Sequence, residues 1–163
     1  MTVSLRMRKL ALTAHVAASV GWLGAVVGFL ALALAGVAST NDERVRAAYL
    51  MMELTGWFVL VPLAVASLLT GLVQSMVSSW GLFRHYWVVA KLLMSVFATL
   101  VLLAYMQTLR DLADVAGETS PSPVLHAAAA LVLLLVATTL AVYKPRGLTP
   151  YGQRKQHDRR RIS

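Results

Sequence analysis

The 163-residue sequence contains no cysteine. Disulfides, thiolate metal sites and cysteine nucleophiles are therefore excluded, and any metal would have to be bound by histidine, methionine, glutamate or backbone oxygen. Charged residues are also scarce, at 13% against about 25% in a typical soluble domain. The sequence lacks a nucleophile triad motif, a phosphate-binding loop, a HExxH motif and a nucleotide fingerprint, so hydrolytic and kinase chemistry have no support.

Four long apolar runs occupy most of the chain, at residues 10–36, 47–73, 86–108 and 124–143. A helix needs about 20 apolar residues to cross the hydrocarbon layer, and each run is long enough. The runs lack the alternation typical of a membrane barrel, so the backbone must be satisfied within helices. The sequence predicts an all-α polytopic membrane protein with four transmembrane helices in an antiparallel bundle. The first run is too long for a signal peptide.

The net charge of +8 is unevenly distributed between the two ends of these helices. Eleven Lys and Arg residues lie at the chain termini or in the second connection, whereas the first and third connections hold three, together with five of the seven acids. Because cytoplasmic loops carry the excess of Lys and Arg, both termini are predicted to be cytoplasmic, with Asn41 and Gly117 in outer loops. Residues 1–147 would form the membrane domain, and residues 148–163 a basic cytoplasmic tail. The tail could bind anionic headgroups or RNA, but topology explains its charge more simply, and no nucleic-acid partner is expected.

Two local features refine the second helix. Asn41 is suited to cap its start, with Asp42 and Glu43 in the first turn, where the helix dipole favours negative charge. Pro62 lies near the middle of the same run and predicts a bend there.

Ionisable side chains within the membrane are costly, so each is a functional candidate. His15 and Lys91 each lie about 9 Å along a helix from the inner interface. Glu53 and His126 lie near the outer interface. The sequence therefore predicts two separate levels and argues against one site that combines all four residues.

At the inner level, Ser19 and Trp22 share the helix face of His15, and Trp87 shares that of Lys91. These five residues are the candidate cofactor-binding set, and the two polar faces could face each other. The alternative is that His15 only donates a hydrogen bond to another helix, while Lys91 extends toward the inner headgroups.

At the outer level, His126 and Glu53 are a candidate metal site, with nearby methionines as further soft ligands. A simple interhelical pair is the alternative. On the first helix, Gly21, Gly24 and Gly28 form a face on which another helix can approach closely. We interpret this face as a packing surface that could also support a homo-oligomer.

The run 14–24, together with residues 87–93, resembles a broad set of bacterial membrane proteins. Over nearly the whole length the chain resembles a family of four-helix integral membrane proteins of unknown function. It is also distantly similar to CopD-type copper-resistance membrane domains and HemJ-type protoporphyrinogen oxidases. The latter resemblance covers a histidine seven residues before a tryptophan and a lysine four residues after one. It implies that His15 and Lys91 contact a porphyrin, although Val89 stands where those oxidases have a histidine.

Three classes of function follow for a protein of the bacterial inner membrane. A structural or accessory role in the lipid bilayer is slightly favoured. The first alternative is a haem b or porphyrin binder that uses His15 and Lys91, and if it is an enzyme, a membrane oxidoreductase. The second is a copper or small-solute permease with an outer site at His126 and Glu53.

Overall fold

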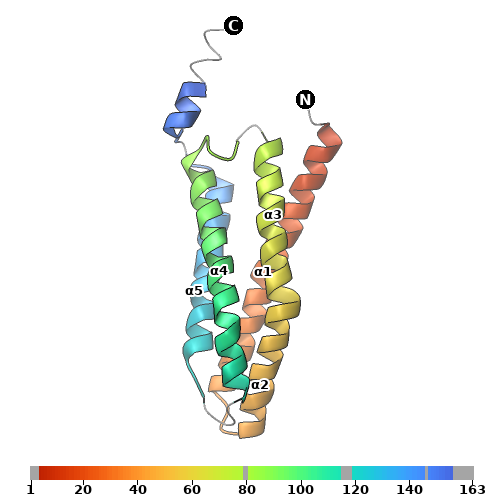
Figure 1. Cartoon of the computed structure of the whole chain (residues 1–163), viewed down its shortest axis with the longest axis vertical. Helices are drawn as coiled ribbons and strands as arrows, with labels where there is room; N and C mark the ends of the chain where they lie inside the picture. Colours follow the sequence, from red (N-terminus) through yellow and green to blue (C-terminus); the bar gives the residue numbers. More distant parts are fainter. Residues whose placement is uncertain (1–3, 79–80, 115–118, 146, 156–163) are drawn as a thin grey trace.

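The computed structural model describes residues 4–78, 81–114, 119–145 and 147–155. In this part of the chain, four helical spans cross the molecule side by side (Figure 1). The spans are α1 (Leu5–Val37), α2 (Asp42–Thr55) continuing through η1 (Gly56–Leu60) into α3 (Val61–Val77), α4 (Tyr86–Asp114) and α5 (Ser122–Tyr143). The predicted all-α, four-helix membrane fold is confirmed.

Polar side chains cap the starts of α1 and α2. The Ser4 side chain accepts a hydrogen bond from the backbone N–H of Met7 at the start of α1. Asn41 Oδ1 accepts one from the Arg44 N–H at 3.0 Å, as the sequence predicted. Both bonds satisfy N–H groups that have no partner within the helix.

The second span is irregular just before Pro62. Residues Gly56–Leu60 form a π-helix, in which the Val61 N–H bonds to the carbonyl of Gly56, five residues earlier. Pro62 follows in the first turn of α3, inside the continuous span, where it has no N–H to donate to the backbone ladder. The sequence predicted a bend at Pro62, and the structure places a π-helical turn directly ahead of it.

The bundle is tightly packed in only one half. The start of α1 and the end of α5 lie at the same end of the molecule (Figure 1). The core lies in the half away from that end and contains large buried side chains from every span, among them Trp22, Tyr49, Met52 and Leu109. On α1 the first buried residue is Ala18. The half nearer the termini is therefore the looser one.

The segment after α5 packs against the connection between α3 and α4. Leu148 pairs with His85 in an antiparallel bridge, and the Thr149 N–H donates to the Arg84 carbonyl at 3.0 Å. The Thr149 hydroxyl donates to the Phe83 carbonyl. The first residues of the predicted tail are thus a strap on the membrane domain, and residues 156–163 lie outside the described part.

Gly152 lies where the strap meets the backbone of Arg84. A Cβ at Gly152 would clash with the Arg84 carbonyl oxygen, a backbone atom that cannot move aside alone. We expect Gly152→Ala to detach the strap and to speed hydrogen exchange of the Thr149 amide by at least tenfold, measured by mass spectrometry. Gly147→Ala is the matched control, because its Cβ would meet Tyr86 at an ordinary 3.5 Å. Equal exchange in both variants would show that the contact at Gly152 does not hold the strap.

Among the described residues, the glycine face of α1 has a close neighbour only at Gly21. A Cβ at Gly21 would lie 3.3 Å from the Leu63 side chain, whereas Gly24 and Gly28 have nothing within 4 Å and are exposed. The expectation of intrachain packing is therefore wrong at Gly24 and Gly28. A GxxxG spacing shows that a face permits close approach, but it does not say whether the partner helix belongs to the same chain. A homo-oligomer through this face stays a prediction.

Candidate functional site

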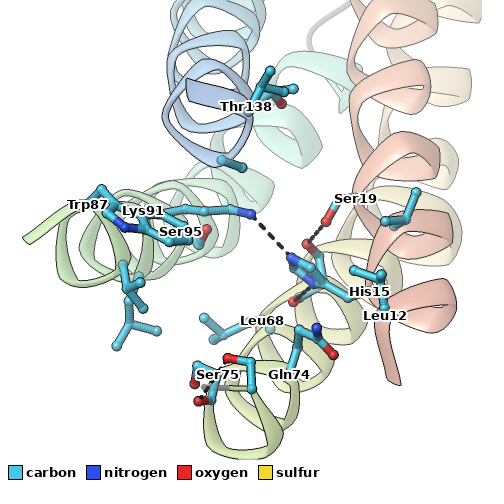
Figure 2. A pocket seen from close by; sticks show the side chains of 18 of the residues that line it. Leu12, His15, Ser19, Leu68, Gln74, Ser75, Trp87, Lys91, Ser95 and Thr138 are labelled. Carbon is cyan, nitrogen blue, oxygen red and sulfur yellow. Dashed lines mark hydrogen bonds between the residues drawn. The ribbon is translucent and has the colours of Figure 1, made fainter. Parts of the chain in front are cut away.

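The looser half of the bundle encloses a cavity of about 760 Å³. All four spans line it, and it reaches the end of the bundle where α1 begins and α5 ends. Four of the five predicted cofactor-binding residues lie on its wall: His15 and Ser19 from α1, and Trp87 and Lys91 from α4 (Figure 2). Arg8, Lys9 and Lys144 line the end nearest the termini.

His15 and Lys91 meet inside this cavity. Lys91 Nζ lies 3.3 Å from His15 Nε2, so two residues 76 positions apart are joined by one hydrogen bond (Figure 2). The depth estimate from sequence had placed both at the same level. The bond joins α1 to α4 across the cavity.

The hydrogen bonds of His15 define its tautomer. Nδ1 lies 3.2 Å from the Ser67 carbonyl oxygen, which can only accept, so Nδ1 carries the proton. Nδ1 is also 3.2 Å from the Thr70 hydroxyl, whose own proton goes to the Ala66 carbonyl at 2.6 Å. Nε2 is therefore the acceptor of the ring and takes its hydrogen bond from Lys91. An imidazole held in this way presents a lone pair on Nε2, the form that ligates metals.

Lys91 brings a positive charge into the membrane without a carboxylate partner among the described residues. The ion pair found in that part of the chain joins Arg110 Nε to Glu53 Oε1 at 3.1 Å, at the opposite end of the bundle. An ammonium group has three donors, and the bond to His15 uses one. A buried charge of this kind is costly unless it is paired. An acidic group on a ligand would supply the pairing.

The sequence analysis missed the contribution of α3. Ser67, Thr70, Gly71 and Gln74 all lie on the face of α3 that meets His15 and the cavity, and Ser67 also bonds to Ser19 at 2.8 Å between their hydroxyl oxygens. A Cβ on Gly71 would come within 3.0 Å of the imidazole carbon Cε1, so glycine allows the ring to lie against the helix. These residues are spaced three and four apart within an apolar run. That spacing was the signal that could have revealed this face.

Trp22 is placed elsewhere. Its side chain is only 3% exposed and lies in the packed core, where it borders a second, apolar cavity of about 120 Å³. It does not line the larger cavity. The helical spacing from His15 was correct, but Trp22 packs into the core, whereas its neighbour Leu23 still lines the larger cavity.

His126 and Glu53 have different partners. His126 Nδ1 donates to the Ser122 carbonyl at 2.9 Å, and the ring stacks on Tyr105 with 3.9 Å between centroids. Glu53 pairs with Arg110. No group of three or more histidine, aspartate or glutamate side chains that could hold a metal occurs among the described residues. These contacts suit a structural role in joining α2, α4 and α5.

No protein-family model, curated protein or solved structure matches the chain. The resemblances drawn from the two sequence runs therefore stay predictions, and the functional argument depends on the geometry of the cavity.

Proposed function

We propose that the protein binds an amphiphilic carboxylic acid of the porphyrin class, such as haem b or its metal-free precursor, in the cavity that contains His15 and Lys91. The observation that carries the proposal is the His15–Lys91 pair: a histidine with its Nε2 lone pair directed into a cavity, beside a lysine with no acidic partner among the described residues. If the His15–Lys91 pair were purely structural, we would expect it in a packed core and not at the wall of a 760 Å³ cavity.

The residues present fit such a group in size and in chemistry. Small-molecule pockets span about 300–1,000 Å³ and are mostly apolar with a few polar anchors. Six Leu, four Val and Trp87 supply the apolar part of this wall, and the polar anchors lie on α1, α3 and α4. The basic residues at the terminal end, including Arg8 and Lys9, suit propionate groups. A haem would supply an iron centre for redox chemistry or ligand binding.

The role of each residue follows from its bonds. The Ser67 carbonyl holds the Nδ1 proton of His15 and thereby orients the ring with Nε2 toward the cavity. Lys91 donates to Nε2 when no ligand is bound, and its flexible stem lets the ammonium turn to a ligand carboxylate instead. That exchange frees the imidazole nitrogen at the same time as it pairs the buried charge. Ser19 and Ser67 hold α1 and α3 together beside the ring.

The proposal is tested by the visible spectrum of the protein purified in mild detergent from haem-producing cells. We expect a Soret band, or its appearance when haem is added at a one-to-one ratio. A protein that is colourless and takes up neither haem nor protoporphyrin would contradict the proposal and return the accessory role to first place.

We also propose that both termini face the cytoplasm, because the basic residues gather at the end of the bundle where α1 starts and α5 ends. The absence of cysteine makes this directly testable. We expect Thr40→Cys, in the connection between α1 and α2, to react with an impermeant maleimide in intact cells. Gln153→Cys should react only after the cells are opened. The reverse pattern would invert the topology.

A further inference from the structure

The wall of the larger cavity is exposed on one side only. Its lining residues on α3 and α4, such as Ser67, Leu68 and Leu92, are buried or half-buried. By contrast, its lining on α1 and α5 includes strongly exposed side chains: Val20 is 63% exposed and Val142 is 70% exposed. Val16 and Thr138 are also exposed. The cavity therefore opens between α1 and α5.

This opening runs along the side of the bundle and is not confined to its end. Val20 lies about 16 Å along α1 from Lys9, given the rise of 1.5 Å per residue. Lys9, Val16 and Val20 all line the cavity, which therefore extends well into the membrane-spanning region. In Figure 1 the first turns of α1 lean away from α5, whereas the two helices pack together in the other half. Along this length a side opening faces acyl chains rather than water.

We propose that the ligand enters from the bilayer, through the opening between α1 and α5, and that the site selects a membrane-dissolved amphiphile whose acidic group lies at the basic end. This inference rests on the proposed function but makes a separate claim about the route. Two features support it. The rim of the opening on both helices is apolar at Val16, Val20 and Val142, which suits a ligand that arrives from lipid.

The second feature is the arrangement of charge. The side chains that line the opening toward the termini are cationic, at Arg8, Lys9 and Lys144, and Lys91 lies deeper on the opposite wall. No acidic residue lines the cavity within the described part of the chain. An amphiphile that moves sideways out of one leaflet keeps its acid at headgroup depth and its apolar body at the depth of Val20. This is the arrangement that the wall presents.

The route is tested by blocking the opening. The single variants Val20→Cys and Thr138→Cys are each modified with a bulky maleimide, and each protein is reconstituted in phosphatidylcholine vesicles. Haem carried by a second set of vesicles is then added, and uptake is followed at the Soret band. We expect both adducts to slow uptake by at least tenfold. The controls are adducts at Val27→Cys and Val132→Cys, which lie on the same two helices and are also exposed, at 49% and 61%, but do not line the cavity. Unchanged uptake with the Val20 and Thr138 adducts would contradict side entry.

A second measurement separates this inference from the porphyrin proposal. A fatty acid with a photoreactive diazirine on its chain is incorporated into the vesicles and activated without any porphyrin present. We expect crosslinks on the inner wall, at Leu92 and Leu68, besides those on lipid-facing residues. The maleimide adduct of Val20→Cys should remove the inner crosslinks. Crosslinks confined to outward residues such as Val27 and Val132 would show that lipid-borne chains do not enter the cavity, whether or not haem binds.

Discussion

The His15→Ala variant is expected to lose high-affinity haem binding. The imidazole Nε2 is the nitrogen directed into the cavity, and its orientation is held by the Nδ1 bond to the Ser67 carbonyl. Alanine would remove the proposed iron ligand together with the acceptor of the Lys91 hydrogen bond. We expect the affinity for haem, titrated at the Soret band, to fall at least tenfold, about 1.4 kcal/mol, with the residual spectrum shifted toward that of unligated haem.

His126→Ala is the matched control, because it also removes a membrane histidine whose Nδ1 donates to a carbonyl. It lies at the other end of the bundle, beside Tyr105, and should leave the haem spectrum unchanged. Loss of the spectrum in His126→Ala but not in His15→Ala would move the site to the opposite half of the bundle.

Trp22→Ala is expected to produce the largest loss of stability. The indole is 3% exposed and packs among Val26, Phe29 and other core side chains of the closed half. Truncation of a large buried aromatic costs about 3–5 kcal/mol through lost contacts and the remaining cavity. Between helices in a membrane, packing contacts are a main source of stability. The measurement is the free energy of unfolding in mixed detergent micelles.

Trp57→Ala provides the control, because it removes the same type of side chain from an exposed position. The Trp57 indole on η1 is 41% exposed, so its truncation removes fewer contacts within the chain. It should destabilise the protein by much less. If Trp22→Ala unfolds no more readily than Trp57→Ala, the packed half of the bundle is not where the structure places it. The haem affinity of the Trp22→Ala protein that remains folded should be unchanged, because Trp22 does not line the larger cavity.

The architecture could be predicted because the membrane imposes it. Four apolar runs of sufficient length, without alternation, leave only helices as a solution. The start of α2 at Asn41 could also be predicted, because an asparagine followed by two acids favours a helix start. The relative depth of His15 and Lys91 followed from counting residues along two helices, and the structure brings the two side chains to 3.3 Å.

The remainder depended on how the helices are arranged around the bundle axis. Helical spacing places Trp22 on the face of His15. It does not show that His15 lines a cavity whereas Trp22 is buried in the packed core. Gly24 illustrates the same limit, because its spacing permits close packing while the nearest helix of this chain lies elsewhere. Likewise, the contact between Gly152 and Arg84 joins segments far apart in sequence, and no local pattern indicates it.

The central claim is that Lys91 pairs with the acid of a ligand held beside His15, and it is tested most directly by comparing protoporphyrin with its dimethyl ester. The two molecules share the same ring, but the ester has no negative charge. The affinities of the wild-type protein and of Lys91→Met are measured for both by fluorescence titration. We expect the wild-type protein to favour the acid at least tenfold and Lys91→Met to lose most of that preference. Equal binding of acid and ester by the wild-type protein would contradict the account.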